Sequence, residues 1–153
     1  MVLSLGIVFI QDLKFRRIHV LLPVLIAVFS FLLLKSSFAN FYRDMIQNIV
    51  IFLFIFLILI VYMSVKNKKI INPFQTYFGM GDFLFYIAVA PLFITFNFIL
   101  YFILSMLFSI IMFLLLRKKM KEETIPLAGF ASLLLLALIA SDMFLDFYKI
   151  TVL

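Results

Sequence analysis

Residues 45–65 read MIQNIVIFLFIFLILIVYMSV and contain no charged side chain. A helix that crosses a bilayer needs about 20 consecutive, mostly apolar residues, so this stretch is long enough to span one. The rest of the chain has the same character, because 67% of its 153 residues are hydrophobic and only 13% are charged. A soluble domain has roughly 45–50% apolar and about 25% charged residues. A chain this short cannot hide 22 Phe side chains from water, so we expect it to lie in lipid.

Polar residues divide the chain into six apolar segments. We therefore expect a single all-α transmembrane domain over residues 1–153, with six membrane-spanning helices and no separate soluble domain. The predicted helices run from Met1 to about Gln11, from about Ile18 to Leu34, from about Met45 to Val65, from near Asp82 to about Thr95, from about Asn97 to Leu116, and from about Pro126 to Ser141. Pro91 is expected to kink the fourth of these helices.

The basic residues predict the orientation, because Lys and Arg are enriched in cytoplasmic loops. Ten of the 13 follow the first, third and fifth predicted helices, namely Lys14, Arg16, Arg17, Lys66, Lys68, Lys69, Arg117, Lys118, Lys119 and Lys121. The other loops hold only Lys35, Arg43 and Lys149. The N-terminus is therefore predicted outside and the three basic loops inside. We attribute the net charge of +6 to this topology and to contact with anionic lipids, and expect no nucleic-acid partner.

The polar chemistry available to the chain is limited. It has no cysteine, which excludes disulfides, thiolate nucleophiles and Cys-ligated zinc. Its single histidine, His19, excludes a His-rich metal site within one chain. We expect neither a metal nor another cofactor. Any catalysis would have to use carboxylates, hydroxyls or lysines.

Two acids are predicted on the inner side, at the ends of different helices. Asp12 ends the first helix and Asp82 begins the fourth, so the topology places them on one face at similar depth. Two neighbouring carboxylates would share a proton, and one could then activate a water while the other hydrogen-bonds a carbonyl oxygen. Asp142 and Asp146 are predicted on the opposite side and cannot join them.

Each of these acids also has an ordinary structural interpretation. Asp12 could pair at the interface with Lys14 or Arg16, and Asp82 could be the N-cap of the fourth helix. Asp82 is nevertheless preceded by Gly79 and Gly81, which are half of the glycines in the chain. Glycine permits backbone conformations closed to other residues and lets a neighbouring chain approach closely.

Three short stretches carry a resemblance to a known family. Residues 79–82, GMGD, resemble the G-x-G-D motif of intramembrane aspartyl proteases. Residues 12–18, DLKFRRI, resemble the segment that carries the first aspartate of prepilin peptidases, and residues 125–131, IPLAGFA, resemble an element that opens a late helix there. All three occur in the order found in the prepilin peptidase family and span most of the chain.

The resemblance implies an aspartic endopeptidase that cleaves the basic leader of prepilin-like substrates at the cytoplasmic face of a bacterial or archaeal membrane. Asp12 and Asp82 would be its catalytic pair, supported by Gly79 and Gly81. Large members carry an N-terminal extension with a Cys-rich zinc loop and a methyltransferase activity. This cysteine-free chain resembles the short, peptidase-only form, so we expect no N-methylation by it. The resemblance fixes neither the substrate nor the oligomeric state.

The chain also departs from the family pattern. His19 and Val20 stand where the family often has Pro and Asn, and Phe83-Leu84 follows Asp82 where Val-Lys is common. These changes motivate an alternative, a non-catalytic membrane assembly or scaffold subunit derived from such a peptidase. A small cation-coupled transporter is a third possibility, which the lack of a predicted mid-membrane acid disfavours.

Overall fold

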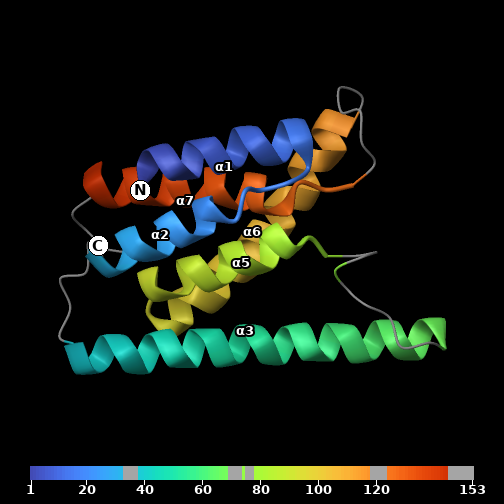
Figure 1. The fold of residues 1–153 in the computed structure, drawn as a ribbon, viewed down its shortest axis with the longest axis horizontal. Coiled ribbons are helices and arrows are strands. Elements are labelled where there is room, and N and C mark those ends of the chain that lie inside the picture. Colours follow the sequence, from blue (N-terminus) through green and yellow to red (C-terminus); the bar gives the residue numbers. More distant parts are fainter. Residues whose placement is uncertain (33–37, 69–73, 75–77, 118–123, 145–153) are drawn as a thin grey trace.

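The computed structural model describes residues 1–32, 38–68, 74, 78–117 and 124–144, and this part of the chain is all-α (Figure 1). Its six α-helices and one 3-10 turn are α1 (Val2–Phe15), α2 (Leu21–Leu32), α3 (Phe38–Asn67), α5 (Met80–Val89), η1 (Ala90–Leu92), α6 (Thr95–Leu116) and α7 (Leu127–Phe144). The prediction of an all-α chain is confirmed. Lys35, Lys69, Lys118, Lys119, Lys121, Asp146 and Lys149 lie outside the described residues.

Two helix boundaries differ from those predicted. α3 begins at Phe38, well before the predicted start near Met45, because no Gly or Pro interrupts the residues that precede it. The predicted fourth helix, expected to be kinked by Pro91, instead ends at Val89 and continues as the 3-10 turn η1. Proline has no backbone N–H to donate to the carbonyl four residues earlier, so the α-helical bonding stops there.

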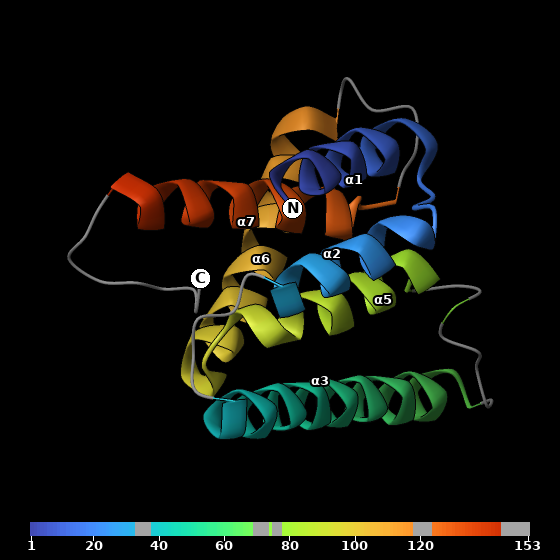
Figure 2. The same ribbon diagram turned by 60° about the vertical axis from the view of Figure 1, so that its left-hand side comes forward.

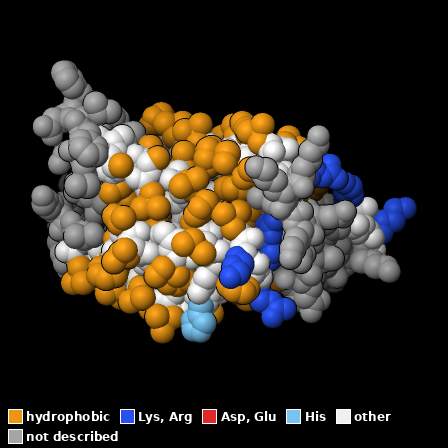
Figure 3. Space-filling model, turned by 90° about the horizontal axis from the view of Figure 1, so that it is seen from above, with side chains coloured by type: hydrophobic (Ala, Val, Ile, Leu, Met, Phe, Trp, Pro, Cys, Tyr) orange, Lys and Arg blue, Asp and Glu red, His pale blue; other side chains and the backbone are white. Residues whose placement is uncertain are grey.

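α1 and α6 run antiparallel to α7, whereas α2 and α5 run parallel to each other (Figures 1 and 2). α1 packs against α7, α2 against α5, and α6 against α7, while α3 contacts η1 and α6. Figures 1 and 2 show that α1, α3 and α6 end at one end of the bundle, where α2, α5 and α7 begin. The described basic residues of the three loops therefore share that end, on the right in Figure 1. Figure 3 shows Lys and Arg side chains gathered at the same end and apolar side chains over the middle of this face.

α6 buries most of its polar side chains and exposes most of its Leu and Ile side chains. Its buried residues are Asn97, Phe98, Tyr101, Ser105 and Ser109. Its exposed ones include Leu100, Ile103, Leu104, Leu107, Ile110, Ile111, Leu114 and Leu115. A helix on the surface of a soluble protein has the reverse pattern.

Two helices are long and apolar enough to cross a membrane, over Tyr42–Asn67 and Thr95–Leu116. Only 17% of the most apolar window of each is buried inside the structure. The central helix of a soluble protein would be mostly buried, so this low value distinguishes both helices from such a core. The other helices, including Leu21–Leu32 and Met80–Leu92, are shorter.

Asn48 connects α3 to the turn that follows α5. It is fully buried, and its side-chain amide donates to the carbonyl oxygens of Ala90 and Phe93, both at 2.8 Å. Carbonyls at the end of a helix have no partner within the helix, and Asn48 supplies one here. Phe52, one turn further along α3, packs its ring against Phe83 and Tyr86 of α5, so a polar contact and an aromatic contact hold the two helices together.

We expect Asn48→Ala to lower the free energy of unfolding by about 1–3 kcal/mol, because it leaves two buried carbonyl oxygens without their donor. Asn67→Ala is the matched control, since Asn67 makes the same type of bond to Met63, also at 2.8 Å, but at an exposed position. Its cost should stay within about 0.5 kcal/mol. Denaturant titration of the detergent-solubilised protein measures both, and equal losses would contradict the role given to Asn48.

Candidate functional site

Asp12 lies near the end of α1 and is directed into the bundle. Only 6% of its surface is exposed, and its Oδ2 atom accepts a hydrogen bond of 2.6 Å from the backbone N–H of Gly129. α1 ends because Arg16 adopts a left-handed conformation with φ of 53°, and the Arg16 N–H then donates to the Asp12 carbonyl oxygen. The chain turns there toward α2. Of the two partners suggested for Asp12 at the interface, Lys14 is exposed, whereas Arg16 interacts electrostatically with the carboxylate, which is buried and bonded to another helix.

Asp82 lies in the first turn of α5. The N-cap of this helix is Gly79, so the interpretation of Asp82 as the N-cap is wrong. The Asp82 carboxylate reaches back to the backbone N–H of Gly79, and its Oδ1 atom accepts a hydrogen bond of 2.8 Å from the N–H of Ala128. The side chain is therefore shared between the start of its own helix and the start of α7.

The two carboxylates meet at the N-terminus of α7. Ala128 donates to Asp82 and Gly129 donates to Asp12, so consecutive backbone amides bind acids that are 70 residues apart in the sequence. Consecutive residues lie within about 3.8 Å of each other, which makes the carboxylates close neighbours. The first N–H groups of a helix have no partner within the helix and lie at its positive end, so both features favour carboxylates at this position.

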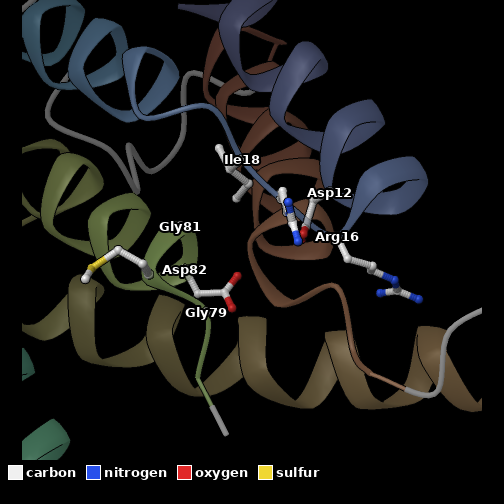
Figure 4. A pocket seen from close by; sticks show the side chains of 8 residues that line it. Asp12, Arg16, Ile18, Gly79, Gly81 and Asp82 are labelled. Carbon is white, nitrogen blue, oxygen red and sulfur yellow. The ribbon is translucent and has the colours of Figure 1, made fainter. Parts of the chain in front are cut away.

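A pocket of about 260 Å³ opens beside the two acids (Figure 4). It is lined by Asp12, Arg16, Arg17, Ile18, Gly79, Met80, Gly81 and Asp82. Figure 4 shows Asp12 on α1 and Asp82 on α5 facing the same space, with Ile18 on the connection between α1 and α2. Arg16 interacts electrostatically with both carboxylates, and the exposed Arg17 and Met80 lie at the rim. The pocket is large enough to hold water beside the acids.

Three of the four glycines allow close approach in this region. A Cβ atom on Gly79 would lie 2.8 Å from Asp82 Oδ2, one on Gly81 would lie 3.0 Å from Ile18 Cβ, and one on Gly129 would lie 3.0 Å from Asp12 Oδ2. None of the four has a positive φ, so the unusual backbone conformation expected at Gly79 and Gly81 is not used. Their role is steric, because a side chain would displace the acids or the chain that carries Ile18.

Sequence reasoning missed the two amides that bind the acids. Ala128 and Gly129 fall within the stretch 125–131, but a backbone N–H leaves no mark in a sequence. It also missed the polar side chains of α6, although Asn97, Tyr101, Ser105 and Ser109 recur at every fourth position of an otherwise apolar helix.

His19 is exposed just before the start of α2, and its backbone N–H donates to the side-chain oxygen of Gln11. Within the part of the chain that the structure covers, no three His, Asp or Glu side chains are grouped to hold a metal ion.

Comparison with protein-family models, with curated proteins and with solved structures gives no match for this chain.

We expect Gly129→Ala to destabilise the protein by about 1–3 kcal/mol, the usual cost of overpacking a filled interior. The added methyl group meets both Oδ2 and Cβ of Asp12, at 3.0 and 3.1 Å, and relieving the second contact requires α1 to move away from α7. Thermal or denaturant unfolding measures the change.

Gly6→Ala is the matched control for this substitution. Gly6 lies within α1, and a Cβ atom there meets nothing within 4 Å. Alanine is favoured over glycine inside a helix, so this variant should gain roughly 0.5–1 kcal/mol. A loss of stability in both variants would show that the contact with Asp12 is not what matters at Gly129.

Proposed function

We propose that this chain is a six-helix membrane protein and an intramembrane aspartyl endopeptidase of the prepilin peptidase type. The observation that carries the proposal is the meeting of Asp12 and Asp82 on consecutive amides of α7, beside an open pocket. The same two residues stand in the stretches that resemble the aspartate segments of that family. Gly79 and Gly81 support the second aspartate by leaving room for its carboxylate and for Ile18.

The exposed surface and the arrangement of the helices support a membrane position for all six. α1, at 14 residues, rises only ~21 Å, less than the roughly 30 Å hydrocarbon core, so its side of the protein requires local thinning of the bilayer or snorkelling by Lys14 and Arg16. The inward polar face of α6 suits a helix surrounded by lipid, because the exposed Leu and Ile side chains then have no unfavourable contact with water. The basic end of the bundle, which holds the pocket, would face the cytoplasm.

The proposed reaction uses the two acids in complementary states. The ionised carboxylate takes a proton from a water, whose oxygen attacks the peptide carbonyl carbon, while the protonated carboxyl group gives its proton to the carbonyl oxygen. When the tetrahedral intermediate collapses, the C–N bond breaks and the leaving nitrogen takes up the proton that the first carboxylate removed from water. The hydroxyl group formed on the carbonyl oxygen returns its proton to the other carboxylate as the carboxylic acid product forms, so both acids regain their starting states. The Ala128 and Gly129 amides hold the acids in position, and the nearby Arg16 guanidinium offsets their negative charge.

The proposed substrate is a prepilin-like protein with a basic leader ahead of a hydrophobic helix. This assignment follows the family resemblance, and the position of the pocket at the basic end of the bundle agrees with it. A scissile bond between a polar leader and an apolar segment would lie where the protein surface changes from charged to apolar (Figure 3).

Asp12→Asn and Asp82→Asn should each abolish cleavage of a prepilin-like substrate by the protein in membranes or liposomes, while the protein still inserts and folds. The amide keeps the size of the side chain but can neither accept the water proton nor donate as an acid. Asp44→Asn is the control, because Asp44 pairs with Arg43 near the other end of the bundle, and it should retain full activity. Full cleavage by both site variants would refute the proposal. A parent protein that cleaves nothing, together with site variants that are only less stable, would favour the scaffold alternative.

The orientation can be tested with single cysteines, since the native chain has none. Lys14→Cys and Lys66→Cys lie at the basic end, and Arg43→Cys lies near the start of α3 at the other end. In intact cells we expect a membrane-impermeant maleimide to label Arg43→Cys, and to label the other two only after permeabilisation. Labelling of Lys14→Cys in intact cells would place the pocket on the outer side.

A further inference from the structure

The buried polar face of α6 contacts both helices that build the site. Asn97, Tyr101, Ser105 and Ser109 are spaced four residues apart, so they lie along one side of the helix, and all four are buried. α5 carries Asp82 and α7 carries the two amides, and α6 is bonded to each of them within the protein interior.

The bond to α5 runs from Tyr86 to Ser105. Their side-chain oxygens are 2.7 Å apart, and because the Ser105 hydroxyl donates to the Phe102 carbonyl oxygen at 2.9 Å, Tyr86 is the donor between them. Tyr86 follows Asp82 by one helical turn, so the two side chains share one face of α5. The Tyr86 ring is fully buried and packs against Phe52, Phe85, Tyr101 and Phe102.

The bonds to α7 come from the next positions of the same face. Tyr101 donates to the Ala131 carbonyl oxygen at 2.9 Å, and Ser109 Oγ, bonded to the Ser105 carbonyl at 2.7 Å, lies 3.4 Å from the Leu127 carbonyl oxygen. Leu127 and Ala131 bracket the Ala128 and Gly129 amides. The Tyr101 bond thus fixes α6 to α7 two residues beyond the amides that hold the acids, and Ser109 contacts α7 on their other side.

We propose that Tyr86 and Tyr101 are positioning residues of the aspartyl site, an inference that rests on the proposed function. Their hydroxyls fix α5 and α7 on α6 at one register, so that Asp82 stays opposite the Ala128 amide and beside Asp12. Packing among apolar side chains tolerates small sliding movements, whereas a buried hydrogen bond has one short, directed geometry. Without the hydroxyls, the helices remain packed but the two carboxylates lose their alignment.

Kinetic measurements on Tyr86→Phe and Tyr101→Phe test this role, because each substitution removes one oxygen and keeps the ring. We expect kcat to fall about 10-fold to 100-fold, since a displacement of ~1 Å can cost about 100-fold in rate, while KM changes less than about twofold. Tyr62→Phe is the matched control, because Tyr62 is 63% exposed on α3, and its kcat should not change. An unchanged kcat in both buried variants would overturn the proposal, and so would a loss confined to KM.

A double-substitution cycle separates this role from a general loss of stability. Ser105→Ala removes the acceptor of the Tyr86 bond and should reproduce the kcat loss of Tyr86→Phe. Because both changes break the same bond, the combined variant should lose no more than about twofold beyond either single variant. Losses that multiply would show that the two residues act independently and would contradict the proposal. If Tyr86→Phe does not fold, Ser105→Ala and Tyr101→Phe decide the matter alone.

A distance measurement tests the inference without any substrate. Met80 begins α5 and Ile125 precedes α7, both are exposed, and the chain is free of cysteine, so spin labels can be placed on Met80→Cys and Ile125→Cys. In the Tyr86→Phe or Tyr101→Phe background the distance distribution should broaden or shift, and in the Tyr62→Phe background it should not. Unchanged distributions in both buried variants would overturn the proposal. A parent protein without peptidase activity would refute the proposed function, yet this measurement would still decide the positioning role.

Discussion

Two consecutive backbone amides hold the candidate site together. The N–H groups of Ala128 and Gly129 are left unbonded by the geometry of a helix start, and two carboxylates from other helices occupy them. This arrangement satisfies donors that would otherwise be unpaired inside the protein and brings together two acids that would repel each other in the absence of donors. These bonds link the positions of three helices, because α1 and α5 each contribute one carboxylate and α7 contributes both amides.

The remaining polar contacts support this group from further away. Asn48 joins α3 to the carbonyls of Ala90, which begins η1, and of Phe93, which follows it. The tyrosines of α5 and α6 join α5 to α7 through α6. In an apolar environment, hydrophobic burial gives little reason for one helix to prefer a particular neighbour, so directional bonds and close packing select the arrangement. A chain that is 13% charged and 67% hydrophobic thus depends on a few buried hydroxyls and amides for its specific geometry.

The sequence predicted the helices well and the contacts between them poorly. Apolar runs are a local property, so the segments around residues 45–65 and 97–116 could be recognised from composition and length. The early start of α3 was missed, and the kink expected at Pro91 is a change from α-helix to a 3-10 turn, because both depend on which local bonds form. Asp12 and Asp82 could be recognised as candidates because the chain contains few acidic residues. Their partners are backbone amides, which every residue except proline possesses, so no residue type could reveal them. The tyrosine and serine spacing in α6 was visible, but averaging hydropathy over a window conceals it.

The order in which the chain is made has a consequence for when the site can exist. Asp12 belongs to α1, which is synthesised before the other described helices, and its partner Gly129 follows 117 residues later in the last of them. At ordinary translation rates of about 5–20 residues per second, both acids are present for several seconds before α7 emerges from the ribosome. A nascent or truncated chain that lacks α7 therefore contains both aspartates but no assembled site. Assembly of the candidate site therefore depends on the arrival of α7.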